Sequence, residues 1–157
     1  MNENQIICRM AYTDEWQDAM GLAWQVFMKF DAPDYDEHGI ESFREFVTDE
    51  TLHRMFLAGS YQVFLAFDKE KMVGIISLRD TTHISLLFVD GSYQRKGIGS
   101  KLIDVARNYI LTEVGGDKLT VNASPYGIEF YHNRGFVDLS KEQTTDGIRY
   151  TPMVFYL

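Results

Sequence analysis

The stretch VDGSYQRKGIGSKLIDVA, Val89 to Ala106, decides which fold this sequence predicts. An apolar run, ISLLFV, leads into it, and the residues after the second glycine repeat apolar side chains at helical spacing. Between these two segments lies a polar, basic loop in which two glycines flank one isoleucine. The pattern predicts a buried strand, a tight turn and the N-terminus of a helix.

A turn of this kind at the start of a helix is suited to binding an anion. The first backbone N–H groups of a helix have no partner within it, and the helix dipole adds partial positive charge there. Glycines let a phosphate approach the main chain closely. Arg95, Lys96 and Lys101 add positive charge. The simpler alternative is a tight turn with a basic, solvated rim, and the turn by itself does not decide between them.

Two common nucleotide-binding motifs do not fit this loop. A Walker A loop needs the order Gly-Lys-Ser/Thr, whereas Lys96 precedes Gly97 here. A dinucleotide fingerprint, G-x-G-x-x-G, needs a third glycine where Leu102 stands. The order of elements also lacks the repeated βαβ units of that fold.

Working outward from the loop, the hydrophobic pattern predicts a mixed α/β chain. Thr13 or Asp14 is expected to cap the first helix. No repeat, low-complexity tract or linker interrupts the sequence, so we expect one domain over residues 1–157. The predicted strands cover 5–11, 61–67, 72–78, 82–89, 118–122, 136–139 and 149–156, and the predicted helices 14–30, 40–48, 50–58, 98–114 and 126–133.

The charge of the chain is unevenly distributed. Residues 1–60 hold 12 acidic and 4 basic side chains, whereas residues 61–157 hold 11 of each, so the net charge of −8 lies in the first part. An acidic protein is a poor candidate for binding nucleic acid. The acidic part is either a solvated surface or a region that attracts a cationic partner.

The sequence also limits the location of the protein. No apolar run approaches the roughly 18 residues of a membrane span, so no membrane association is expected. The first residues, MNENQIICRMAY, do not resemble a signal peptide. The single Cys8 cannot form an internal disulfide, and we expect it to be a buried small side chain in a reducing compartment. A cytoplasmic protein is therefore predicted.

The hexapeptide QRKGIG, Gln94 to Gly99, resembles the Q/R-x-x-G-x-G/A motif of the GCN5-related N-acetyltransferases (GNAT family). Its context strengthens the resemblance, because LLFVD precedes it and SKLIDVARNYI follows. Further on, VNASPYGIEFYHNRGF resembles the second motif of the family. The resemblance is sharpest over 84–136 and extends over the whole chain. One departure is Gly91, where many relatives have proline, and this is expected to loosen the entrance of the loop while leaving its amides in place.

The resemblance implies a fold and an activity. The fold is a mixed, mostly antiparallel sheet flanked by helices, in the order strand, two helices, three strands, helix, strand, helix and two strands. The activity is transfer of an acetyl group from acetyl-coenzyme A to a primary amine by direct attack, without a metal. No Cys/His cluster suggests a zinc site.

The resemblance also implies which residues bind the co-substrate. Main-chain groups of Phe88 or Val89 would face the pantetheine arm and the acetyl carbonyl, in a gap between the strands ISLLFV and LTVNA. Asn122 and Ser124 would bind the pantetheine arm or order the site. The expected contacts to the phosphates come from Gln94, Arg95, Lys96, Gly97, Ile98, Gly99 and Ser100.

Tyr131 stands where many relatives have a general acid near the sulfur of coenzyme A. The departing thiolate belongs to a thiol with a pKa of about 8.5, and a phenol of pKa about 10 can give it a proton if the site orients it. The alternative is a packed aromatic side chain.

The group that takes the proton of the amine is harder to assign. Relatives often place a carboxylate on the strand before the loop, and the only titratable side chain there is His83, which is either the base or an edge histidine with no catalytic role. The acidic stretch DAPDYDEHGIE, residues 31–41, either attracts a cationic amine or forms a solvated loop. Cationic amines that this stretch could attract include polyamines, aminoglycosides and peptide N-termini.

Other functions stay open from the sequence. The same fold serves equally as an acyl-coenzyme A sensor or partner module that transfers nothing, or as an interaction domain whose glycine loop is only a turn. The acyl group can be longer than acetyl, and a homodimer is compatible with the resemblance because many relatives dimerise.

Overall fold

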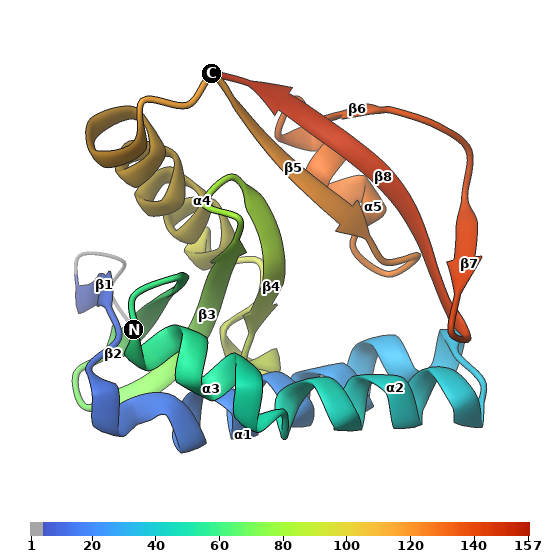
Figure 1. The fold of residues 1–157 in the computed structure, drawn as a ribbon, viewed down its shortest axis with the longest axis horizontal. Helices are drawn as coiled ribbons and strands as arrows, with labels where there is room; N and C mark the ends of the chain where they lie inside the picture. Colours follow the sequence, from blue (N-terminus) through green and yellow to red (C-terminus); the bar gives the residue numbers. More distant parts are fainter. Residues whose placement is uncertain (1–4) are drawn as a thin grey trace.

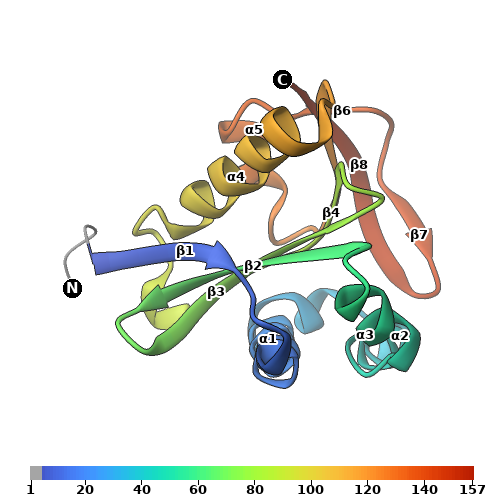
Figure 2. The same cartoon turned by 60° about the vertical axis from the view of Figure 1, so that its left-hand side comes forward.

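The computed structural model describes residues 5–157 and shows an open sheet with helices on both faces (Figures 1 and 2). The strands are β1 (Ile6–Met10), β2 (Tyr61–Asp68), β3 (Lys71–Arg79), β4 (His83–Val89), β5 (Lys118–Ala123), β6 (Val137–Asp138), β7 (Gln143–Thr145) and β8 (Ile148–Tyr156). The α-helices are α1 (Trp16–Val26), α2 (Glu37–Val47), α3 (Glu50–Leu57), α4 (Ile98–Tyr109) and α5 (Ile128–Asn133).

The sheet has the order β1-β2-β3-β4-β5-β8-β6, and β7 pairs with β8 beside this path. Neighbouring strands are antiparallel except β4 and β5, which are parallel. The predicted fold class, a mixed and mostly antiparallel sheet flanked by helices, is therefore confirmed. The parallel pair is connected through α4, as a crossover between parallel strands requires.

The structure differs from the expected order at two places in the described chain. Three α-helices separate β1 from β2, which departs from the two of the family order but confirms the predicted helices 14–30, 40–48 and 50–58; Asp49 caps the separate helix α3 directly after α2. The extra strand β7 forms because residues 143–148 turn back as a hairpin onto β8. Both additions flank the sheet and leave the order of its central strands as predicted.

The start of α1 also differs from the prediction. Neither Thr13 nor Asp14 caps it, because Thr13–Glu15 forms a short 3-10 turn before the helix. Glu15 accepts the N–H of Tyr12 at 2.7 Å and pairs with Arg9 at 2.8 Å. A carboxylate from inside the turn therefore replaces the predicted hydroxyl or aspartate cap.

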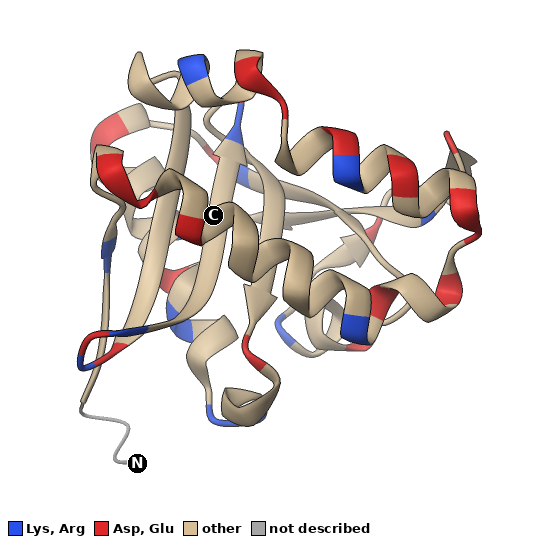
Figure 3. Ribbon diagram, turned by 90° about the horizontal axis from the view of Figure 1, so that it is seen from below, with Lys and Arg blue, Asp and Glu red and all other residues tan. Residues whose placement is uncertain are grey.

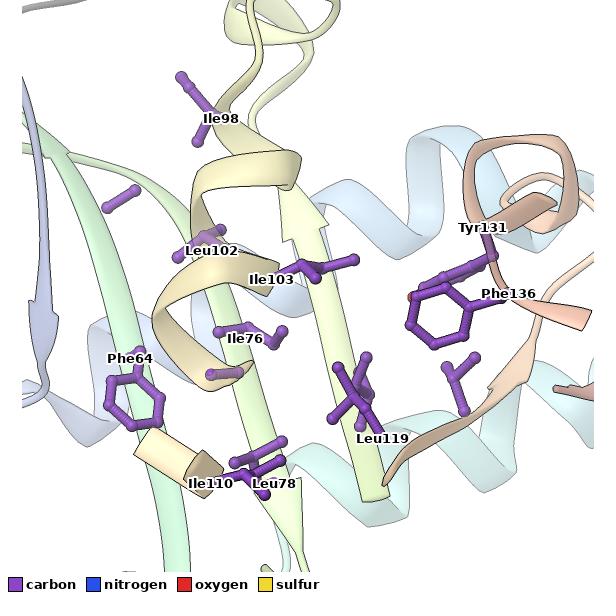
Figure 4. Packing of buried hydrophobic residues seen from close by; sticks show 14 of the residues in the cluster. Phe64, Ile76, Leu78, Ile98, Leu102, Ile103, Ile110, Leu119, Tyr131 and Phe136 are labelled. Carbon is purple, nitrogen blue, oxygen red and sulfur yellow. The ribbon is translucent and has the colours of Figure 1, made fainter. Parts of the chain in front are cut away.

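Two hydrophobic cores cover the two faces of the sheet. One lies under α4 and α5, where Leu102, Ile103 and Ile110 pack on strand residues such as Ile76 and Leu119 (Figure 4). The other lies under α1, α2 and α3 and is rich in aromatic rings. Both faces are closed by apolar packing, which explains why β2, β3 and β4 read as nearly continuous apolar runs.

The acidic residues of the first part of the chain gather in one layer. The helices α1, α2 and α3 lie together on one face of the sheet, and Figure 3 shows acidic positions along them. The uneven charge of the sequence is therefore also uneven in space. In the described chain, no helix combines the length and the apolar character that crossing a membrane requires.

The strand β4 contains a bulge next to its junction with β5. Ser77 of β3 lies opposite Leu86 and Leu78 lies opposite Ile84, so Ser85 is an extra residue on β4. The buried hydroxyl of Tyr61 donates to Ser85 Oγ at 2.9 Å and lies 2.6 Å from Ser77 Oγ. Bulges of this kind redirect a strand and are common beside active sites.

Replacing Tyr61 by phenylalanine is expected to destabilise the fold by about 1–2 kcal/mol, because two serine hydroxyls at the bulge lose their partner. Urea unfolding measures this loss. The matched control is Tyr109→Phe on α4, which keeps its ring against Phe64 and is expected to change the free energy of unfolding by less than about 0.5 kcal/mol. Equal stabilities for the two variants would show that the serines find other partners.

Candidate active site

The strands β4 and β5 pair only at one end and then separate. Their pairing covers His83 with Thr120 and Ile84 with Val121, and it stops there. The remainder of β4, residues 85–89, runs apart from the end of β5, as Figure 1 shows. Main-chain N–H and C=O groups of both strands therefore lie at the split without a partner across it.

The N-terminus of α4 lies just beyond the end of β4. Arg95 and Gly97 both have left-handed backbone angles, with φ of 62° and 82°. Two such residues in three positions turn successive N–H groups toward one side, as in anion-binding loops. The first intrahelical bond runs from Lys101 N–H to Gly97 O, so the amides of the first turn are not used inside the helix.

Gly97 is open on the side where a β carbon would project. No atom lies within 4 Å of that position, and the positive φ disfavours any other residue. The surroundings therefore fit a bound phosphate at the backbone of this turn. One predicted contact is directed elsewhere, because the ammonium group of Lys96 lies 5.5 Å from the centre of the Tyr93 ring.

Gln94 and Tyr126 connect the two sides of the split. The side chain of Gln94 donates to the Val89 carbonyl at 3.0 Å, and the hydroxyl of Tyr126 donates to Gln94 Oε1 at 2.7 Å. The ring of Tyr126 lies 5.2 Å from that of Phe30, at the end of the first helical segment. Tyr126 was not predicted as a site residue, because its place after Pro125 indicated only the start of a helix.

Gly91 does not loosen the loop as the sequence led us to expect. A β carbon at this position would lie 3.0 Å from Phe30 Cζ and 3.2 Å from Lys29 Nζ. The bare backbone therefore allows the end of the α1 segment to pack directly on the loop. The entrance of the loop is packed, and an aromatic ring occupies the space that a side chain would need.

Tyr131 lies in α5 with only 6% of its surface exposed. Its ring makes edge contacts with Phe130 and Phe136, with centroids 5.4 and 5.2 Å apart. Figure 4 shows the rings of Tyr131 and Phe136 side by side. Burial, and to a smaller extent the charge of Asp31, raises the pKa of the Tyr131 phenol above its ordinary value. A phenol is protonated at neutral pH even at its ordinary pKa of about 10, and the raised pKa makes Tyr131 a weaker acid.

Asp31 is the buried carboxylate of the site, with 7% of its surface exposed. It closes the π-helical turn Phe27–Asp31 after α1 and shares a hydrogen bond with the Ser124 hydroxyl. Ser124 Oγ also accepts the N–H of Gly127 at 3.0 Å. Burial raises the pKa of Asp31 to about 6, and the charge of Asp34 contributes further, while the Ser124 hydrogen bond lowers it.

In the sequence, Asp31 belongs to an acidic stretch, and its burial was not predicted. A usable signal was present, because Ala23, Phe27 and Asp31 follow one another at intervals of four on the inward face of the same helical segment. The rest of the acidic stretch is solvated or structural. Asp34 lies 3.7 Å from Arg149, and Asp36 caps α2.

The titration of Asp31 predicts how stability depends on pH. Its pKa is about 6 in the folded protein against 3.8 as the ordinary value, so its contribution to stability is fully present below pH 4 and is lost as pH rises through 6. We expect Asp31→Asn to be more stable than the wild type at pH 8 by about 2–3 kcal/mol. Urea unfolding from pH 4 to 8 checks this, and a stability difference that does not grow with pH contradicts it.

The other predicted site residues lie around the split. His83 is at its closed end, where Nδ1 lies 2.8 Å from Thr120 Oγ1, and burial followed by the charge of Arg79 lowers the pKa of its imidazole. Asn122 is exposed on β5 just beyond the last pair. Phe88 projects toward the aromatic core and contacts Phe43 edge-on at 5.7 Å.

Comparison with known proteins now decides the family. A family model described as acetyltransferase (GNAT) domain matches residues 31–157. The chain belongs to the GNAT family. The GCN5-related N-acetyltransferase from Rhodopseudomonas palustris has a structure similar to this GNAT chain, with 25% identity and a TM-score of 0.84, over 100% of this chain and 99% of that one.

Two further structures share the GNAT fold at lower identity. The PaiA N-acetyltransferase from Thermoplasma acidophilum, in complex with coenzyme A, is 22% identical with a TM-score of 0.76, over 97% of this chain and 99% of that one. The spermidine N-acetyltransferase from Vibrio cholerae, in complex with coenzyme A and spermine, is 16% identical with a TM-score of 0.67, over 98% and 96%. A search of curated proteins found no match.

Proposed function

We propose that this GNAT protein transfers an acetyl group from acetyl-coenzyme A to a primary amine. The observation that carries the proposal is the N-terminus of α4, with its open Gly97, at the end of the split between β4 and β5. The buried Asp31 carboxylate hydrogen-bonds to Ser124 after β5, and the buried Tyr131 ring lies near Ser124 around Gly127. An anion site, an arm of unpaired strand backbone and a proton donor are what this transfer needs.

In this proposal, the start of α4 holds the pyrophosphate of the co-substrate, and the strands hold its pantetheine arm. The backbone N–H groups from Gly97 to Ser100 hold the pyrophosphate, with Ile98 and Gly99 in the first turn of α4, and Arg95 and Lys96 add positive charge near it. Main-chain groups of Phe88 and Val89, together with Asn122, hold the pantetheine arm between the strands. Gln94 must release the Val89 carbonyl if that carbonyl is to bind the arm.

Direct attack by the amine fits the positions of the nucleophilic groups. Cys8 lies on β1, which is separated from β4 by two strands, and burial raises the pKa of its thiol. Cys8 is only partly buried, which corrects the expected buried side chain. A thiol with a raised pKa is nevertheless a poor nucleophile, so an acetyl-cysteine intermediate is not favoured. Tyr131 supplies a proton to the sulfur as the thioester breaks. The single reduced thiol also fits a cytoplasmic setting.

We propose a cationic acceptor, either a small amine or a peptide N-terminus. The acidic layer of α1, α2 and α3 covers one face of the sheet (Figure 3), and Asp31 ends the turn that follows α1. Such a surface concentrates cations near the site. The structurally similar protein from Vibrio cholerae is a spermidine N-acetyltransferase, which makes polyamines a rational first group to assay.

The test combines binding and turnover. Isothermal calorimetry with acetyl-coenzyme A measures co-substrate binding, and thiol release with a panel of amines measures transfer. We expect micromolar binding and amine-dependent thiol release, with the acetylated amine identified by mass spectrometry. Binding without transfer to any amine would instead identify an acyl-coenzyme A sensor or partner module, and absence of binding by folded protein would reject both functions.

A further inference from the structure

Asp31 is a buried carboxylate without a cation of its own. Within residues 5–157 no salt bridge reaches it, and the one polar side chain that supports its charged form is the Ser124 hydroxyl. The negative charge of Asp34 further raises the pKa of Asp31. Arg149, the nearby cation, pairs with Asp34 at 3.7 Å. A buried charge is normally paired, since burial without a partner is costly.

The groups around Asp31 come from separate segments of the chain. Ser124 after β5 hydrogen-bonds to Asp31, and the Tyr131 ring on α5 lies near Ser124, since a β carbon on Gly127 would lie 3.3 Å from Ser124 Oγ and 3.5 Å from Tyr131 Cε2. Tyr35 follows the short turn Ala32–Asp34, and burial, followed by the charge of Asp31, raises the pKa of its phenol. The ring of Tyr35 stacks on Phe27 at 5.5 Å. A buried carboxylate at the end of a helical turn whose Phe27 stacks on Tyr35 is a suitable environment for an alkylammonium group.

We propose that Asp31 binds the ammonium group of the acceptor amine and takes its proton, so that the amine attacks as the free base. This inference rests on the proposed function and adds to it the residue that selects a cationic acceptor. The hydrogen bond from Ser124 to Asp31 supports it, because the Tyr131 ring lies near Ser124 and the amine and the thioester sulfur must meet near the proton donor. It also accounts for the absence of a carboxylate on β4.

The proton transfers balance. The ammonium gives one proton to the Asp31 carboxylate, and the free amine nitrogen then forms a bond to the acetyl carbon. When the carbon–sulfur bond breaks, the sulfur takes the proton of the Tyr131 phenol, and the nitrogen gives its surplus proton back to the phenolate. Asp31 returns its proton to solvent. The sum is ammonium and acetyl-coenzyme A converted to amide, free thiol and one proton.

Asp31 is better suited to this role than an ordinary aspartate. Because its pKa is about 6, it is mostly ionised at pH 7 and yet is about 100-fold more basic than a solvated aspartate. It therefore combines the charge that attracts the ammonium with a useful proton affinity. His83, the other candidate base, has its Nδ1 beside Thr120 at the closed end of the strands.

The experiment compares Asp31→Asn with Asp34→Asn and His83→Gln. The probe is the best acceptor among n-butylamine, benzylamine, spermidine and alanyl-alanine amide. We expect Asp31→Asn to lower kcat/KM at pH 7 by about 100-fold or more and to retain its affinity for coenzyme A. The matched control Asp34→Asn removes a negative charge three residues away and is expected to stay within about fivefold. In the wild type, kcat/KM should rise with pH through about 6, and this rise should disappear in Asp31→Asn.

Several outcomes would overturn the inference. One is unchanged turnover by Asp31→Asn, and another is a rise through pH 6 that persists in that variant but disappears in His83→Gln. If the wild type turns over no amine, the proposed function fails first, and calorimetry of the coenzyme A complex with the same amines then tests Asp31. Amine binding that Asp31→Asn loses would keep the recognition part of the inference, whereas no amine binding by the wild type would reject it.

Discussion

Gly97→Glu is expected to weaken the binding of acetyl-coenzyme A at least 100-fold. Two effects act together. The backbone of residue 97 has φ of 82°, which costs about 1–3 kcal/mol for a residue with a side chain. The new carboxylate would also fill the open space beside the amides of α4, where it repels phosphates and neutralises the field of the helix N-terminus. Isothermal calorimetry measures the loss directly.

Gly115→Glu is the matched control for this variant. Gly115 follows the π-helical turn at the other end of the α4 segment, with φ of 77° and open space where a β carbon would project. The change adds the same charge and similar backbone strain, so both variants should be destabilised by comparable amounts. Only Gly97→Glu should lose the co-substrate. Wild-type affinity in Gly97→Glu would show that the pyrophosphate binds elsewhere and that this loop is only a turn.

Tyr131→Phe is expected to lower kcat by about 10²–10⁴-fold, the usual contribution of a general acid. The ring would still pack against Phe130 and Phe136, so the fold and the affinity for coenzyme A should change little. The loss arises because the leaving thiolate no longer receives a proton from the Tyr131 phenol, which is protonated at neutral pH. Single-turnover thiol release, with the coenzyme A affinity measured in parallel, separates this effect from binding.

The control for this second prediction is Tyr109→Phe, which removes the same oxygen from a ring packed on Phe64. It should leave kcat within about twofold of the wild type, as expected of a surface change away from the site. If Tyr131→Phe also keeps kcat within tenfold, Tyr131 is a packed aromatic residue, and the thiolate leaves without its help. Since Asp31→Asn is expected to gain stability while losing activity, the two variants together distinguish catalytic from structural roles.

The sequence by itself determined the family, the fold class and the position of the glycine-containing turn before α4. These follow from local patterns, because the apolar run before Val89 and the helical spacing after Gly97 are fixed by neighbours along the chain. The QRKGIG loop needs no distant partner to present its amides, so its conformation could be predicted from glycines and helix geometry. The uneven distribution of charge is likewise a property of the amino-acid order alone.

Only the tertiary structure decided which polar residues meet. Asp31 and Tyr131 are 100 positions apart in the sequence, and no local pattern brings a helix end from one face of the sheet to a helix on the other. Asp31 after α1 and Ser124 after β5 share a hydrogen bond, and the pairing of β4 with β5 has stopped before Ser124, at Ile84 and Val121. Burial then raises the pKa of both side chains, an effect that depends on everything packed around them. The sequence supplied the residues, and the long-range packing determined their ionisation.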